Sequence, residues 1–152
     1  MDMESDEQYM DLALAEAKKA ASAGEVPVGA VIVSAGAVIG RGFNQPISVN
    51  DPTAHAEIIA LREAARHLGN YRLPGATMYC TVEPCMMCAG AMIHARIARL
   101  AFGTPDPKAG CAGSIYNVLT DPRLNHRVDF VSGIREDECA ALLHEFFAKL
   151  RG

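Results

Sequence analysis

Two short motifs in this 152-residue chain combine side chains that can hold a catalytic metal ion. His55-Ala56-Glu57 offers an imidazole and a carboxylate, and Pro84-Cys85-Met86-Met87-Cys88 offers two thiols one helical turn apart. Zinc accepts nitrogen and sulfur ligands, and three protein ligands leave its fourth position open, as catalytic sites require. A carboxylate beside that position can carry protons. The motifs predict His55, Cys85 and Cys88 as metal ligands and Glu57 as the catalytic proton carrier.

Both motifs fall at the starts of expected helices. The apolar spacing predicts one helix from about residue 54 to 67 and another from about residue 85 to 94, with Pro84 at a tolerated starting position. Free amide groups and the helix dipole in a first turn favour thiolate, the form that binds zinc. His55 and Glu57 point about 200° apart on an ideal helix. We therefore expect His55 on the metal and Glu57 on its bound water.

Each motif alone allows another interpretation. A C-x-x-C pair also occurs in redox sites and structural zinc knuckles, and a lone histidine is commonly a hydrogen-bonded core residue. A closed structural site needs a fourth ligand, for which Cys111 and His94 are the only candidates, without motif-like spacing. The joint pattern, H-x-E followed by P-C-x-x-C, is the signature of zinc nucleobase deaminases. The combination therefore favours a catalytic zinc site.

Hydrolytic deamination is the reaction that suits these groups. Zinc lowers the pKa of bound water from about 15.7 to near 7, so that hydroxide forms at neutral pH. Glu57 would accept that proton and return it, first to a ring nitrogen and then to the leaving amine. The hydroxide would attack the ring carbon that bears an exocyclic amino group, and ammonia would be released.

Length and composition predict a single domain that spans residues 1–152. Half of the residues are hydrophobic and 21% are charged, which argues against intrinsic disorder. The sequence has no apolar run of about 18 residues, so no membrane contact is expected. The acidic segment 1–7 lacks the order of a signal peptide, and a cytoplasmic location follows as the default.

The cysteine count and the net charge narrow the chemistry further. Five cysteines are an odd set, which argues against a disulfide framework. Cys80, Cys111 and Cys139 are expected to be small core residues. The net charge of −4 argues against broad, sequence-blind binding of nucleic acid, but it leaves room for a local basic surface.

Strands and helices alternate along the chain, which predicts an α/β fold with helices on both faces of a mixed sheet. Segment 42–51 has the composition of a loop. In the last helix, the apolar residues at helical spacing are assigned to the core: Cys139, Leu142, Leu143, Phe146, Phe147 and Leu150. The expected elements are helices at about 4–23, 54–67, 85–94 and 136–150, and strands at 28–33, 38–41, 77–82, 97–102 and 127–131.

Longer strings around these motifs resemble the cytidine and deoxycytidylate deaminase superfamily, and within it the bacterial tRNA-specific adenosine deaminases. The similarity extends over about residues 7–150. It implies a three-layer α/β/α cytidine deaminase-like fold with a five-stranded mixed sheet, one zinc ion per subunit and a homodimer. The implied activity converts the wobble adenosine (position 34) of an arginine tRNA to inosine. The strings that carry it are 25–31, 50–57, 70–73, 81–97 and 125–128.

The resemblance also assigns substrate-binding residues. Asn44 matches a base-contacting asparagine, and Val28 and Ala30 match positions that line the base pocket. Glu83 matches part of the pocket framework, and we favour a buried hydrogen-bonding strut over a role in proton transfer. Asp106 and Lys108 match a loop that touches the RNA near the target base.

A local basic rim would let an acidic protein hold the anticodon loop of a tRNA. Proteins read such loops through stacking, base-edge hydrogen bonds and phosphate contacts. Lys108 is the first choice for a phosphate contact, followed by His126 and Arg127. Many other basic side chains are expected to be an ordinary solvated surface.

Two other functions remain open from the sequence. A small-molecule deaminase acting on guanine, cytosine or cytidine would share every zinc residue. A non-catalytic zinc module that serves as a partner subunit is the second alternative, although such a module has no use for Glu57. Asn44, Asp106, Lys108 and the last helix are the features that favour an RNA substrate.

Overall fold

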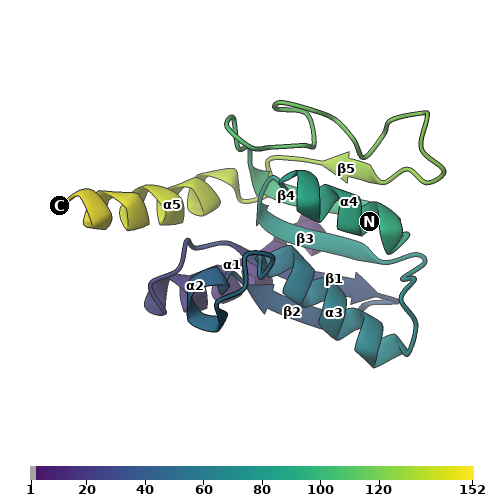
Figure 1. Cartoon of the computed structure of the whole chain (residues 1–152), viewed down its shortest axis with the longest axis horizontal. Coiled ribbons are helices and arrows are strands. Elements are labelled where there is room, and N and C mark those ends of the chain that lie inside the picture. The colour runs from purple at the N-terminus through teal and green to yellow at the C-terminus, as the bar shows by residue number, and fades with distance from the viewer. Residues whose placement is uncertain (1–2) are drawn as a thin grey trace.

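The computed structural model describes residues 3–152 and shows a five-stranded mixed sheet between two helical layers (Figure 1). The strand order is β2-β1-β3-β4-β5, with β1 antiparallel to β2 and β3, and β3, β4 and β5 parallel. This arrangement confirms the predicted fold class. The elements are α1 (Met3–Ser22), β1 (Gly29–Ser34), β2 (Ala37–Phe43), α2 (Pro46–Val49), α3 (Ala56–Leu68), β3 (Thr77–Val82), α4 (Met86–His94), β4 (Arg99–Thr104), β5 (Asp129–Val131) and α5 (Glu136–Arg151).

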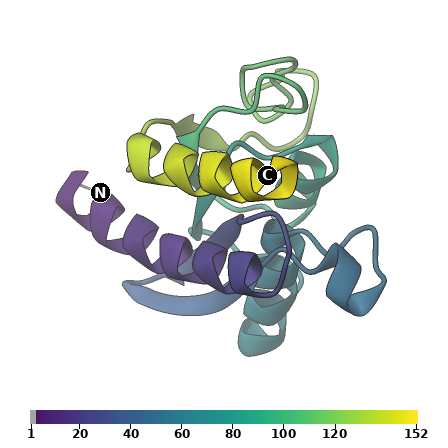
Figure 2. The ribbon, with the colours of Figure 1, turned by 90° about the vertical axis from the view of Figure 1, so that its left-hand side faces the viewer.

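The central strands are buried on both faces. Their side chains alternate between the two faces of the sheet, and a separate layer of helices covers each face. In β1, Ala30 and Ile32 join the core under α3 and α4, whereas Val31 and Val33 join the core under α1 and α5. Figure 2 shows α1 and α5 side by side. The continuous apolar run that predicted this strand is therefore the signature of a sheet covered twice.

Helix α3 lies unusually close to β2, and glycine in the strand permits this approach. A Cβ atom at Gly42 would overlap the carbonyl oxygen of Ala56, and one at Gly40 would overlap that of Ala60. Only glycine leaves room for backbone to pack on backbone here. The close packing fixes the first turn of α3 on the sheet, directly after His55.

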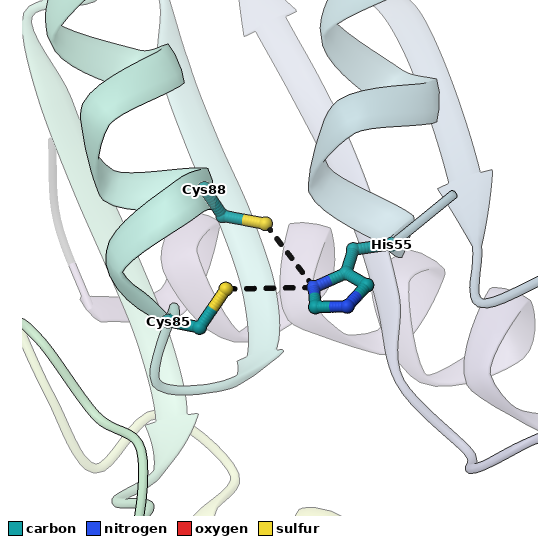
Figure 3. A group of neighbouring side chains, drawn as sticks. All are labelled: His55, Cys85 and Cys88. Carbon is teal, nitrogen blue, oxygen red and sulfur yellow. Dashed lines mark hydrogen bonds between the residues drawn. The ribbon is translucent and has the colours of Figure 1, made fainter. Parts of the chain in front are cut away.

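Helix α4 connects β3 to the parallel strand β4, so its first turn follows the carboxyl end of β3. Ligand sites of open α/β sheets gather at that edge. The first turns of α3 and α4 face each other there (Figure 3). This topology, rather than any single contact, brings the two sequence motifs together.

Several expected boundaries differ from those in the structure. The segment 42–51, predicted as loop, contains the one-turn helix α2, which ends at Asn50 in a left-handed conformation. The fourth and fifth strands begin two residues later than predicted, at Arg99 and Asp129. The delay before β4 arises because Arg96 adopts a left-handed conformation, with φ of 59°, in the turn that ends α4.

The predicted core role of α5 was wrong for its second half. Cys139 is buried and Leu142 packs against the core, but Phe147 is 39% exposed and Leu150 is 69% exposed. Helix α5 packs on β4, β3 and α1, and its C-terminal part extends past the edge of the sheet (Figure 1). The apolar side chains of Phe147 and Leu150 are therefore left exposed by the other described elements.

Buried charge ties α1 to the sheet. Arg99 donates two hydrogen bonds to the carboxylate of Asp6, at 3.0 and 2.6 Å, and the hydroxyl of Tyr79 donates a third at 2.8 Å. Burial opposes ionisation of Asp6, but the bonds from Arg99 and Tyr79 outweigh it and hold its pKa below the ordinary value.

All five cysteines are unpaired, and Cys80, Cys111 and Cys139 are buried, in agreement with their expected place in the core. Within residues 3–152, none of the helices has the length and apolarity needed to cross a membrane. The predicted extent of the domain, 1–152, includes two residues outside the described part and stays a prediction.

Candidate metal centre

Two helix starts bring His55, Cys85 and Cys88 together. His55 immediately precedes α3 and Cys85 immediately precedes α4, both with extended backbone, while Cys88 lies in the first turn of α4. The Nδ1 atom of His55 is 3.5 Å from the sulfur of Cys85 and 3.5 Å from that of Cys88 (Figure 3). All three ligand atoms lie within 4.8 Å of one another. The two motifs thus converge on one point.

These distances fit a tetrahedral zinc ion. Zinc binds histidine nitrogen at about 2.0–2.1 Å and cysteine sulfur at about 2.3 Å. At a tetrahedral angle those bond lengths place nitrogen and sulfur about 3.5–3.6 Å apart. The observed separations of 3.5 Å from Nδ1 to each sulfur match this value. The donor set and its spacing therefore suit one zinc ion with an open fourth position.

The electrostatics of the three groups favour a cation between them. Hydrogen bonding with Cys88 and with His55 lowers the pKa of Cys85 to about 4. The pKa of Cys88 is raised, because it is the partner in the hydrogen bond with Cys85 and because it is buried. The pKa of His55 is raised chiefly by its hydrogen bond with Cys85. One thiolate thus forms readily, and the positive charge of a metal ion would stabilise the second.

Glu57 lies in the first turn of α3 with 4% of its surface exposed. Burial raises the pKa of its carboxyl, and a hydrogen bond with Cys88 acts in the opposite direction. A buried carboxyl whose pKa is raised holds a proton more readily than an exposed one, which suits acid–base work. Glu57 thus lies next to the ligand cluster, and its role as proton carrier stays a prediction.

Three predicted pocket residues lie together where β2 ends and β1 begins. Asn44 follows β2, and its Oδ1 accepts a hydrogen bond of 2.8 Å from the backbone of Ala56, which satisfies a free amide at the start of α3. Ala30 is fully buried in β1. Val28, just before β1, is partly buried and packs against the same core. Asn44 therefore positions the helix that carries the catalytic motif, and its amide nitrogen remains for another partner.

Glu83 holds a long loop that continues from β4. Its carboxylate accepts hydrogen bonds from the backbone amides of Asp106 at 3.0 Å, Ala112 at 2.9 Å and Ser114 at 3.0 Å, and from the hydroxyl of Ser114. These bonds outweigh the opposing effect of burial and lower the pKa of Glu83. The expected buried strut is therefore present in the structure.

The same loop carries Asp106 and Lys108. The carboxylate of Asp106 accepts hydrogen bonds from the amides of Lys108 and Ala109, and so closes a tight turn. The side chain of Lys108 is exposed and borders two hollows. One hollow reaches Cys85 and Tyr116, and the other lies between this loop and α5. Lys108 is thus available to a ligand, whereas Asp106 shapes the turn that presents it.

His126 and Arg127 are not brought to this edge of the sheet. The Nε2 atom of His126 lies 2.7 Å from the carbonyl oxygen of Ile97, which precedes β4. The six residues of β4 separate that end from the loop with Lys108 by about 20 Å. Their predicted contact with RNA stays a prediction, and it would have to be made away from the metal centre.

The sequence reasoning missed a second buried carboxylate that holds a loop. Glu25 is 2% exposed, and its carboxylate accepts hydrogen bonds from the amides of Ile47 and Ser48 and from the Ser48 hydroxyl. This fixes α2 beside Asn44. Ser114 was missed in the same way. The position of each acid in the sequence could have indicated these contacts. Glu25 and Glu83 both adjoin apolar strand segments, where an ionised side chain needs hydrogen-bond partners.

Comparisons with known proteins agree with this geometry. The family model described as cytidine and deoxycytidylate deaminase zinc-binding region matches residues 3–104. The chain is 48% identical to a tRNA-specific adenosine deaminase of Bacillus subtilis over 149 residues, covering 98% of this chain and 92% of that protein. It is 50% identical to a tRNA-specific adenosine deaminase of Haemophilus influenzae over 149 residues, covering 97% and 86%.

Solved structures show the same fold. One, from a study of A-to-I editing by tRNA:A34 deaminases at the wobble position of transfer RNA, has a TM-score of 0.86 and 48% identity, and the match covers 90% of this chain and 99% of that one. A guanine deaminase from Nitrosomonas europaea has a TM-score of 0.82 at 24% identity, over 93% and 84% of the two chains. The second likeness shows the fold alone.

Proposed function

The chain belongs to the cytidine and deoxycytidylate deaminase family, and from this premise we propose that it is a zinc-dependent tRNA adenosine deaminase. The observation that carries the proposal is the cluster of His55, Cys85 and Cys88 at zinc-compatible distances, with the buried Glu57 beside it. The near full-length similarity to tRNA-specific adenosine deaminases supports adenosine in tRNA as the substrate.

We assign one zinc ion per subunit to His55, Cys85 and Cys88. When bound, zinc supplies a Lewis acid that activates water at neutral pH. Glu57 accepts one proton of that water and delivers it to the ring nitrogen beside the reacting carbon, and it then transfers the proton of the added hydroxyl group to the departing amino group. Water and adenosine are consumed, and inosine and ammonia are formed. The burial of Glu57 keeps bulk water from competing for this proton.

The pocket residues hold the base against the centre. Val28, partly buried just before β1, presents apolar surface, which suits the flat face of a purine, and the fully buried Ala30 lies two residues further along, in β1. The Nδ2 group of Asn44 is the donor for the base, because Oδ1 already accepts the amide of Ala56. Glu83 shapes the wall of the pocket from the opposite side.

We place the target at the wobble position, 34, of an arginine tRNA, with the anticodon loop as the partner surface. Lys108 contacts a phosphate near the target, and Asp106 maintains the turn that presents it. His126 and Arg127 would contact RNA farther from the flipped base. The cytoplasm, where tRNA acts in translation, is the proposed location.

We also propose that the working unit is a homodimer of single-domain chains. The supporting surface is an apolar hollow over α3 and α4, on the side away from the sheet. Tyr71, at its rim, is 69% exposed. The hollow is lined by Ile58, Leu61, Arg62, Ala65, Tyr71, Ala91, His94 and Ala95. A second copy would cover this apolar area, and sedimentation equilibrium at micromolar concentration tests for it.

The deciding experiment offers several substrates to purified protein. These are an arginine tRNA transcript with adenosine at position 34, the same transcript with guanosine there, and free adenosine, guanine, cytosine and cytidine. We expect inosine in the first transcript only, read out by nuclease digestion and mass spectrometry. Deamination of free bases or nucleosides without reaction of the tRNA would make the chain a small-molecule deaminase instead.

A further inference from the structure

One buried carboxylate organises the loop that borders two hollows, one of which reaches the metal ligand Cys85. Glu83, at the end of β3, is 3% exposed and accepts bonds from amides that span Asp106 to Ser114. Its own amide donates to the carbonyl oxygen of Thr104 at 2.9 Å. Two ends and the middle of one loop therefore depend on a single side chain from another part of the chain.

The loop is also shaped to fit this carboxylate. A Cβ atom at Gly110 would overlap the carboxyl group of Glu83, so the loop backbone passes directly over it. The amide of Cys111 donates to the carbonyl oxygen of Pro84 at 2.9 Å, which joins the loop to the residue before the metal ligand Cys85. Such close packing leaves the loop little freedom while the carboxylate is present.

Most of the side chains on this loop face outward, so its fixed shape serves something outside the core. Lys108, Ile115 and Tyr116 are exposed and line the hollow that reaches Cys85. Lys108 also borders the hollow against α5, together with Phe147. If Glu83 only stabilised the fold, its main hydrogen-bond partner would not need to be an exposed loop that carries Lys108.

We propose that Glu83 is a positioning residue for the substrate: it holds the loop 105–116 in the shape that receives tRNA, and it acts on binding more than on the chemical step. The proposal rests on the proposed function, because it assumes an RNA substrate at this site. Its physical basis is preorganisation, since a loop that is already ordered loses less conformational entropy when the ligand binds.

The test compares the variant Glu83→Gln with the wild type. The amide keeps the size of the side chain but replaces one acceptor oxygen with an NH₂ group, which faces backbone amides that also donate. We expect KM and the directly measured Kd for the tRNA to rise about tenfold, while kcat changes less than about threefold. Hydrogen exchange at the amides of Ala112 and Ser114 should become faster, and zinc content should stay at the wild-type level.

Two further variants separate positioning from general stability. Ser114→Ala removes one bond to the carboxylate and leaves the charge, so KM should rise about threefold even if Glu83→Gln fails to fold. Asp6→Asn alters a buried, hydrogen-bonded carboxylate on the far helical layer. It should lower the melting temperature without raising KM.

The outcomes that overturn the proposal are specific. An unchanged KM in Glu83→Gln and Ser114→Ala, despite faster amide exchange, would show that the shape of the loop does not matter for binding. A fall in kcat together with loss of zinc would mean that Glu83 supports the metal centre instead. If the wild type itself does not act on tRNA, the proposed function fails, whereas this inference fails alone when the wild type is active and the variants bind normally.

Discussion

The metal centre and the loop 105–116 lie side by side, but they are built in different ways. The centre takes its ligands from the first turns of two helices, where Cys85 and Cys88 are three residues apart and their spacing is set by helix geometry. The loop has no regular structure of its own, and its shape depends on the carboxylate of Glu83. The ligand cluster is thus set by the geometry of local elements, whereas the loop is set by several long-range hydrogen bonds to one carboxylate.

This difference predicts how each region responds to change. Loss of a metal ligand should remove the reaction, because no neighbouring group among the described residues can replace an imidazole or a thiolate at 3.5 Å. Loss of a loop contact should weaken binding by degrees, because several bonds share the task.

Cys88→Ala should abolish activity, with turnover falling at least about 10³-fold, because a two-ligand site cannot retain zinc against a chelator. Atomic absorption and a tRNA deamination assay measure the two effects. Cys139→Ala is the matched control, since Cys139 is a buried cysteine on the other helical layer, and it should retain zinc and activity. Full zinc occupancy in active Cys88→Ala protein would contradict the expected difference between the two regions, in which loss of a metal ligand abolishes the reaction.

Glu57→Gln should keep the zinc and the fold but lower kcat by about 10²–10⁴-fold, because the amide cannot carry the proton. KM for the tRNA should change little. Glu63→Gln, on the exposed side of the same helix, serves as the control. Rapid deamination by Glu57→Gln would assign the proton transfer to another group.

Lys108→Ala should weaken tRNA binding a few-fold and leave kcat for the bound substrate nearly unchanged. The slope of log K against log salt concentration should fall by about 0.7–1, as expected for one lost phosphate contact. Lys18→Ala changes an exposed lysine on α1 and should alter neither value. An unaltered slope in Lys108→Ala would exclude this lysine from the RNA interface.

The Asp6–Arg99 pair should affect stability without affecting turnover. Because the pKa of folded Asp6 lies below its ordinary value of 3.8, its contribution is fully present above that pH and is lost as the pH falls through the lowered pKa. Asp6→Asn should therefore cost about 2 kcal/mol at pH 7 and progressively less below about pH 4. Urea unfolding at several pH values measures this, and an equal cost at pH 7 and pH 2.5 would contradict the assigned ionisation.

The sequence was sufficient for features that depend on neighbours in the chain. The ligand spacing, the buried strand β1 and the helix starts at both motifs all follow from local pattern, and each is present in the structure. The prediction failed for the second half of α5. The helical spacing of Phe147 and Leu150 identifies an apolar face, but it does not show whether other elements lie close enough to bury that face.

Long-range contacts could not be predicted. Glu83 and Ser114 are 31 residues apart, and no periodicity links them. Glu25 and Ser48 present the same difficulty on the other side of the pocket. In both cases the acid alone was visible in the sequence, while its partners are a distant serine hydroxyl and backbone amides, and backbone amides carry no sequence signal.

X-ray absorption at the zinc edge of the purified, active protein tests the central claim most directly. The account predicts a first shell of two sulfur atoms at about 2.3 Å and two nitrogen or oxygen atoms at about 2.0–2.1 Å. Those distances correspond to Cys85 and Cys88, His55 and one solvent-derived ligand. A shell of three or four sulfurs, or one with none, would contradict a three-residue catalytic centre beside Glu57.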